Sequence, residues 1–372
     1  MSDIAIVGAG VIGLASACEL RKRGADVTVF ERDEAGHAAS WAAAGMLAPY
    51  SEALGDAALE ALCLASLERY PAFVAELAER SSVDAYLRLD GTIHLAFDET
   101  DEARLEALAA AVRTAPRMLS RAELLEMEPM VSKHAVAGLS IEGEGHVDNR
   151  RLGRALLAAA LAAGVRVEER AGDIAVESDA RRILGLRTAR GFRPARIVVN
   201  ATGAWAGGLP GVAVAVPVTP KKGQMAALAV PRGFARRLVW TPDVYLVPRA
   251  DGRLLIGATV EDAGFDQRVT AEGVATLLAA ALRAAPSLGS FALSETWAGL
   301  RPASADGRPF IGATSVEGYF VASGHYRNGI LLTPVTAELL ADAIEGRPPK
   351  IDAAPFDPRR TEQIDASWNR TA

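Results

Sequence analysis

The stretch Asp3–Gly13, which reads DIAIVGAGVIG, decides the fold of this 372-residue chain. Its apolar run predicts a short buried strand, and the glycine pattern GxGxxG follows directly. An amphipathic helix is expected to continue to about Arg23, and a second predicted strand, Val27–Phe30, leads into Glu31. Strand, glycine turn, helix, strand and acid together predict the βαβ unit that holds the ADP part of a dinucleotide.

Each part of this unit has a physical role. Gly8 allows a tight turn, Gly10 lets the main chain approach the pyrophosphate, and Gly13 lets helix and strand pack closely. The helix N-terminus favours an anion because its N–H groups are unpaired and its dipole is positive there. Glu31 is expected to accept hydrogen bonds from the ribose hydroxyls. An ordinary glycine-rich turn is the alternative, and it would require neither the second strand nor the acid.

The bulk composition is that of an ordinary globular protein, with 50% hydrophobic residues, 23% charged residues and a net charge of −6. A chain of this length forms two domains, or one large domain with an insertion. The net charge gives no basic surface for nucleic acid, and the alanine-rich runs are too short to span a membrane. The chain begins in a strand rather than a signal peptide, and its two cysteines, Cys18 and Cys63, make no disulfide framework. We therefore expect a cytoplasmic protein, and a homodimer or homotetramer is compatible with the sequence.

The rest of the chain alternates between helical and strand patterns. Ile197–Trp205 predicts a buried strand that ends in a turn of small residues and crosses the nucleotide sheet again. Leu87–Phe97 predicts a hairpin about its Asp-Gly dipeptide. Val214–Val218 is the first of several predicted strands with a period of two, which indicate an antiparallel sheet. The last unit is predicted as a strand, a glycine-containing turn and a helix over Asn328–Glu345.

Three further segments indicate what the nucleotide site does. Ala39–Pro49, ASWAAAGMLAP, has small side chains that let main-chain N–H groups approach a flat ring system; an alanine-rich loop packed under a helix is the alternative. Gly299–Pro302, GLRP, is followed by the related DGRP at Asp306–Pro309. Gly324–Ile330, GHYRNGI, predicts a strand-to-helix turn whose N–H groups face a flavin ring. A helix N-terminus there would stabilise the negative charge of the reduced ring.

With these motifs, the chain resembles the D-amino-acid oxidase superfamily and, within it, the glycine oxidases of thiamine biosynthesis. The resemblance covers essentially the whole chain. It implies an α/β fold with an FAD-binding, Rossmann-like domain of the glutathione reductase type and a second, antiparallel-sheet domain that binds substrate. We expect the FAD-binding domain to be discontinuous, over residues 1–85, 146–212 and 298–372, with the substrate-binding domain over 86–145 and 213–297.

The resemblance implies that FAD is bound noncovalently, because neither cysteine lies in the C-terminal region where related sarcosine oxidases attach their flavin. The five histidines and two cysteines show no metal-ligand spacing, so no metal site is expected. The glycine turn and the resemblance together assign FAD contacts to Gly8, Gly10, Val11, Ile12, Gly13, Glu31, Arg32, Ala39, Ser40, Ala44, Gly45, Met46, Asp173, His325, Tyr326, Arg327, Asn328, Gly329, Ile330 and Leu331.

The resemblance also implies a substrate site made by Arg301, Tyr245 and Arg327. In the family, the arginine of the GLRP motif clamps the substrate carboxylate. The planar guanidinium suits this task because it meets a carboxylate with two parallel hydrogen bonds. The implied reaction is hydride transfer from the neutral amine to FAD. The imine then hydrolyses, and O2 reoxidises the flavin to give hydrogen peroxide.

Other readings of these residues remain open. Arg301 could be a structural arginine paired with Asp306, Arg327 could face solvent at a helix start, and Tyr245 could be a core residue.

The chain also departs from its relatives at two positions. Asp243 stands where many have a histidine, and Val260 falls where some have a pocket-lining methionine. The nearest functional alternative is a D-amino-acid or N-methyl-amino-acid oxidase or dehydrogenase. A non-catalytic flavin subunit is a more distant one.

Overall fold

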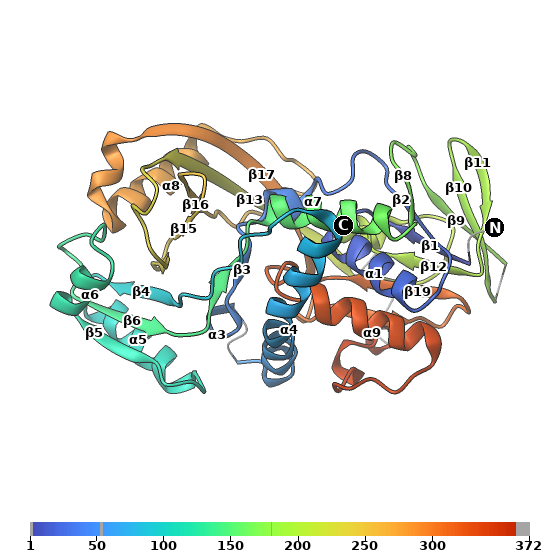
Figure 1. Cartoon of the computed structure of the whole chain (residues 1–372), viewed down its shortest axis with the longest axis horizontal. Coiled ribbons are helices and arrows are strands. Elements are labelled where there is room, and N and C mark those ends of the chain that lie inside the picture. The colour runs from blue at the N-terminus through green and yellow to red at the C-terminus, as the bar shows by residue number, and fades with distance from the viewer. Residues whose placement is uncertain (1–2, 53–54, 180, 362–372) are drawn as a thin grey trace.

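The computed structural model describes residues 3–52, 55–179 and 181–361. Two sheets organise the chain, one on each side of Figure 1, and two helices, α4 (Ala57–Ser81) and α7 (Asn149–Ala162), lie between them. None of the helices in these residues is both long and apolar enough to cross a membrane.

The first sheet has six strands in the order β18-β19-β12-β1-β2-β8, and all neighbours are parallel except β18 and β19. Segments from the beginning, middle and end of the chain therefore meet in one layer. This confirms the predicted Rossmann-like sheet. The strands are β1 (Ile4–Val7), β2 (Val27–Phe30), β8 (Arg166–Glu168), β12 (Ile197–Asn200), β18 (Phe310–Ala313) and β19 (Tyr319–Ser323).

The predicted glycine turn joins β1 to α1 (Val11–Lys22). Gly8 has φ +105°, and a Cβ there would lie 2.4 Å from the carbonyl oxygen of Ala201. A Cβ on Gly13 would lie 1.9 Å from the carbonyl oxygen of Gly8. Only glycine fits at both positions, because one needs a left-handed backbone and the other an unusually close helix. These contacts agree with the roles predicted for Gly8 and Gly13.

Alternate residues of β1 pack into two different hydrophobic cores, because successive side chains of a strand point to opposite faces of its sheet. Ile4 and Ile6 join the core made with α1, α4, α7 and α9 (Thr333–Glu345). Ala5 and Val7 join the core on the opposite face of the sheet. That face is covered by a three-stranded antiparallel sheet of β9 (Ala175–Ser178), β10 (Ile183–Thr188) and β11 (Gly191–Pro194).

The second sheet has eight strands in the order β17-β13-β16-β15-β14-β4-β6-β5, and α8 (Ala271–Ala284) contacts β13 and β16. Its neighbours are antiparallel except β14 and β4, which are parallel and come from separate parts of the chain. The strands are β4 (Thr92–Ala96), β5 (Arg117–Ser120), β6 (Ala137–Ile141), β13 (Val218–Ala229), β14 (Leu238–Trp240), β15 (Tyr245–Pro248), β16 (Arg253–Gly257) and β17 (Ala292–Ser304).

Short elements connect the two sheets and carry parts of the site. They are α2 (Ala39–Ala42), β3 (Met46–Leu47), α3 (Pro49–Glu52), β7 (Gly145–His146) and the 3-10 helix η1 (Gly203–Gly208). The helices α5 (Glu99–Ala111) and α6 (Arg121–Met127) lie beside β4 to β6.

Three predicted elements differ in the structure. The hairpin over Leu87–Phe97 does not form, because β4 pairs with β6 and β14 rather than with the residues before it. The strand predicted over Val214–Val218 begins only at Val218, since Pro217 cannot donate to a ladder. The last helix begins at Thr333 instead of Asn328, with Pro334 in its first turn, a position that proline favours.

The predicted domain boundaries stay a prediction. The described strands do separate by sheet, but β17 passes as one continuous strand through the boundary predicted between residues 297 and 298. Figure 1 shows β13 and β17 running from the second sheet toward the middle of the molecule. Residues of both strands line one cavity together with residues of the first sheet.

Candidate active site

A cavity of about 630 Å³ is lined by residues from both halves of the structure. The sequence-predicted site residues that line it are Gly8, Gly10, Val11, Ile12, Glu31, Arg32, Ala39, Ser40, Ala44, Gly45, Met46, Asp173, Tyr245, Arg301, His325, Tyr326, Arg327, Gly329 and Ile330. Three predicted residues do not line it: Gly13 packs against the glycine turn, and Asn328 and Leu331 are buried in the core behind the cavity.

At one end of the cavity lies the glycine turn. The helix α1 begins there with no acidic residue in its first turn and no side-chain cap on Gly10, so its positive end is open to the cavity. Ser40 Oγ accepts from the N–H of Val11 at 3.1 Å. Glu31 Oε2 accepts from the N–H of Ala9 at 2.8 Å, which turns the carboxylate toward this turn. The arrangement suits a pyrophosphate and a ribose.

Several lining residues were not in the predicted set. They follow β8 or β12 or lie on β13, β17 or β19, and the sequence gave only a weak signal for them: small residues at the end of a strand. Trp205, on η1, lies under the Arg32 guanidinium, with 4.8 Å between Cζ and the ring centroid. The unpredicted lining residues include Gly172, Ile174, Ala201, Thr202, Gly203, Ala204, Trp205, Leu209, Pro210, Gly223, Met225, Leu300, Ala322 and Ser323.

The segment Ala39–Met46, which we call the cofactor loop, is held from behind by side chains. Nδ2 of Asn149 donates to the carbonyls of Ser40 and Trp41 at 2.8 and 2.9 Å. Nε1 of Trp297 donates to the carbonyl of Ala42 at 2.9 Å. A Cβ on Gly299 would lie 2.4 Å from that of Ala42, so the loop packs directly on β17.

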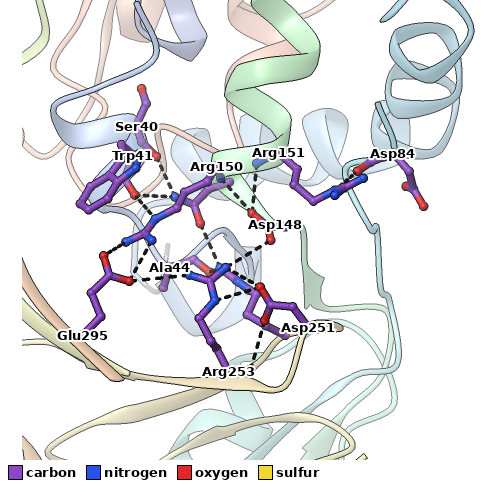
Figure 2. Close-up of polar contacts among 12 residues, drawn as sticks. Ser40, Trp41, Ala44, Asp84, Asp148, Arg150, Arg151, Asp251, Arg253 and Glu295 are labelled. Carbon is purple, nitrogen blue, oxygen red and sulfur yellow. Dashed lines mark hydrogen bonds and ion pairs between the residues drawn. The ribbon is translucent and has the colours of Figure 1, made fainter. Parts of the chain in front are cut away.

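An arginine on α7 covers the side of this loop. Figure 2 shows Arg150 beside Trp41 and facing Glu295 on β17. Its guanidinium carbon lies 3.7 Å from the Trp41 ring centroid, and its two Nη atoms each reach a Glu295 oxygen at 2.9 Å. The cofactor loop is therefore fixed by contacts from α7 and β17, which hold its cavity-lining residues in place.

The turn between β19 and α9 lines the cavity from the other side. Tyr326 has φ +47°, which directs the chain around the corner. Tyr70 and Ser66 on α4 donate to the carbonyls of Ile330 and Leu331 at 2.5 and 2.6 Å. His325 lies 3.0 Å from Thr336 through Nε2, and burial lowers its pKa to about 3, so it is neutral and serves as an ordering residue.

Arg301 projects from β17 into the cavity. Its Nη1 donates to the carbonyls of Lys222 and Thr259 at 3.3 and 3.1 Å. The alternative pairing with Asp306 does not occur, because Asp306 binds Arg360 at 2.8 Å. Within the part of the chain that the structure describes, both of these carbonyl contacts use the same nitrogen, Nη1. The rest of the guanidinium fork can therefore donate to a carboxylate.

Tyr245, on β15, lines the same end of the cavity and is buried. Its hydroxyl donates to the sulfur of Met225 at 3.4 Å. Burial raises the pKa of Tyr245, and the nearby Arg301 and Arg327 only partly offset this, so the phenol is protonated at neutral pH. A protonated phenol can donate a hydrogen bond to an anion.

Arg327 also lines the cavity, and it pairs with Glu52 on α3. Its Nε lies 2.6 Å from Oε2 of Glu52, and its Nη2 donates to Oε1 at 3.0 Å. Glu52 has a side chain only 4% exposed, and burial raises its pKa against the opposing effect of Arg327. Arg327 is therefore held in place at the cavity wall rather than directed away into solvent.

The two positions that depart from the relatives lie outside the cavity. Asp243 faces solvent and lies 3.7 Å from Arg283. Val260 is 56% exposed and does not line the cavity. Neither residue is therefore part of the pocket wall.

The residues present fit FAD. The cavity joins an anion-binding helix start to a wall of small residues, and glycine occupies the positions where a Cβ would collide with the surrounding main chain. Neither cysteine lines the cavity, which suits a noncovalent cofactor.

Comparisons with known proteins find similar glycine oxidases. A glycine oxidase from Geobacillus kaustophilus (strain HTA426) is 39% identical over 361 residues, which cover 95% of this chain and 96% of the relative. The crystal structure of glycine oxidase from Geobacillus kaustophilus matches with a TM-score of 0.92 at 38% identity, covering 96% of this chain and 98% of that one.

A longer relative is the bifunctional protein ThiO/ThiG of Nostoc sp. (strain PCC 7120), 36% identical over 346 residues. The match covers 92% of this chain but only 52% of that protein, so the chain spans about half the length of this relative. The family described as "FAD dependent oxidoreductase" matches residues 3–343. With the cavity and its glycine turn, these matches establish FAD as the cofactor, and the chain belongs to the FAD-dependent oxidoreductase family.

Proposed function

We propose that this protein is an FAD-dependent oxidase of glycine and other small amines, including sarcosine and small D-amino acids. The observation that carries the proposal is one cavity in which a dinucleotide turn at one end faces Arg301, Tyr245 and Arg327 at the other. The glycine oxidases among its relatives, similar over nearly their whole length, support this assignment.

The side chains of the cavity are suited to amino-acid oxidation. Arg301 offers a forked donor to the substrate carboxylate, and Tyr245 adds a neutral donor beside it. Arg327, fixed by Glu52, contributes a second positive charge at the same wall. Together these groups orient the α-carbon of a small amino acid toward the cofactor. No base is required at the α-carbon if hydrogen leaves as hydride from the neutral amine.

Bound FAD supplies a hydride acceptor that can pass electrons to O2. In the proposed reaction a hydride leaves the α-carbon and a proton leaves the nitrogen, so the amine becomes an imine. Water hydrolyses the imine to an oxo acid and ammonia, and O2 takes up the two electrons of the hydride and two protons to give hydrogen peroxide. Burial near the cofactor excludes bulk water from the reacting carbon, and the protein's own part is to bind and orient. We further propose that the imine made from glycine serves the thiazole half of thiamine.

One experiment tests the role of the arginine. Arg301→Ala should raise the KM for glycine strongly while the purified protein remains yellow with bound FAD. Loss of FAD from this variant would show that Arg301 is structural. Peroxide released in proportion to amine consumed would identify an oxidase, whereas electron transfer only to a quinone or another protein would identify a dehydrogenase.

A further inference from the structure

Arg249 is a buried arginine that no role in substrate or cofactor contact explains. It follows β15 directly, its residue is only 7% exposed, and it does not line the cavity. Its Nη2 donates to the carbonyl of Ala44 at 2.7 Å and to Oδ1 of Asn149 at 2.9 Å. One guanidinium therefore joins the cofactor loop to the residue that holds the other end of that loop.

Burying the Arg249 guanidinium has a free-energy cost. Within the described residues, Nη1 is buried without a hydrogen-bond partner, and no carboxylate lies within ion-pair distance of the group. Burial lowers the pKa of Arg249 to about 10, so it still carries its charge at neutral pH. A buried cation without a paired anion destabilises a fold, and an apolar side chain of similar size is often better for stability.

The position of Arg249 directly after β15 indicates what this contact does. Tyr245 begins β15 and Arg249 follows its last residue, Pro248, so the two residues lie close together on one short, paired segment. The acceptor residue Ala44 belongs to the cofactor loop, which lines the cavity. Figure 2 shows Ala44 between α7 and the hairpin that carries Arg253.

We propose that Arg249 is a positioning residue that fixes the cofactor loop against the strand carrying Tyr245, and so sets how substrate and cofactor face each other. The part of this proposal that concerns substrate rests on the proposed function. The part that concerns the loop rests only on FAD binding. Hydride transfer is sensitive to such alignment, because a small displacement of the reacting atoms lowers the rate steeply.

The Arg249→Met variant separates positioning from a merely structural role. We expect the dissociation constant of FAD, measured by titrating apoprotein with the cofactor, to rise about tenfold or more. We expect the rate constant for anaerobic flavin reduction by glycine to fall by about tenfold. The melting temperature of the apoprotein should stay unchanged or rise, whereas a structural role requires it to fall with no specific loss of FAD affinity.

Arg253→Met is the matched control. Arg253 lies four residues later in the same hairpin and pairs with Asp251 at 2.8 Å and, at 3.8 Å, with Asp148 and Glu295. None of these three partners belongs to the cofactor loop. Its FAD dissociation constant should stay within about twofold of the unmodified protein. If Arg249→Met does not fold, Arg249→Lys decides the question, because lysine keeps the charge and one donor, and its FAD affinity should lie between the two.

Unchanged FAD affinity in both Arg249 variants would overturn the proposal. The FAD titration needs no substrate, so its result stands even if glycine fails to reduce the flavin. In that case the proposed function fails and the positioning role of Arg249 is judged on cofactor affinity alone. A normal FAD affinity combined with normal flavin reduction in Arg249→Met would leave Arg249 without the proposed role.

Discussion

Replacing Gly223 by alanine should weaken substrate binding while leaving the fold and FAD in place. Gly223 lies on β13 beside the guanidinium of Arg301. A Cβ at this position would lie 2.3 Å from Nη1, 2.4 Å from Nη2 and 2.5 Å from Cζ of Arg301. The guanidinium must therefore retreat by about 1 Å to reach ordinary van der Waals contact. Because it ends a flexible side chain, the arginine moves rather than the sheet.

The size of the effect follows from the hydrogen bonds that Arg301 would lose. A hydrogen bond to a charged group is worth about 1.5–3 kcal/mol, so misplacing the guanidinium should raise KM for glycine by about 10- to 150-fold. FAD content should not change, because Gly223 packs against Arg301 and not against the glycine turn.

Steady-state kinetics with glycine, together with the FAD content of the purified variant, measure this effect. Gly153→Ala, on α7, is the control, because its new Cβ would find its nearest atoms at 3.8 Å or beyond. A Gly223→Ala enzyme with an unchanged KM would refute the reasoning that Arg301 binds the substrate carboxylate. Loss of FAD together with activity would instead mean that the strand itself had moved.

Three further predictions address other parts of the site. Tyr245→Phe should keep FAD but raise the KM for glycine by about 2- to 12-fold, since one neutral hydrogen bond is lost. An unchanged KM would mean that Tyr245 is a core residue that does not bind substrate. Gly45→Ala should be purified without FAD, because Gly45 has φ +73° and a Cβ would lie 2.1 Å from the carbonyl oxygen of Val147; a fully yellow variant would contradict this. Burial lowers the pKa of His94 to about 3 from 6.5. The contribution of neutral His94 to the free energy of unfolding is therefore fully present above pH 6.5 and is lost as the pH falls toward 3. As the pH is lowered from 7 to 5, denaturant unfolding should show the free energy of unfolding of His94→Gln rise by about 2 kcal/mol relative to that of the unmodified protein. A difference between the two proteins that does not change with pH would exclude the effect.

The part of the fold nearest the N-terminus could be predicted because its signals are local. The βαβ unit needs only a run of apolar residues, three glycines and an acid in order, and the structure forms each of these elements at the predicted place. The capping box of Ser120 and Glu123 at the start of α6 depends on equally local sequence, because both partners lie within one helical turn.

The wrong hairpin and the missed site residues share one cause, which is pairing that local sequence does not determine. The residues of Leu87–Phe97 carry a good turn dipeptide, yet β4 finds its partners in β6 and β14, which are distant in sequence. Arg249 and Asn149 carried no motif at all, since their shared contact with the cofactor loop exists only after α7 and the hairpin have packed together. Gly223 was missed for the same reason: its closeness to Arg301 arises across two paired strands.

The central claim is that a small amino acid reduces the flavin of this protein. Anaerobic mixing with glycine, sarcosine, D-alanine and D-proline, one at a time, tests it by following the visible absorbance of bound FAD. We predict that glycine or sarcosine bleaches the flavin, and that admitting O2 restores the colour and releases hydrogen peroxide. A flavin that none of the four reduces, although a chemical reductant bleaches it, would contradict the account.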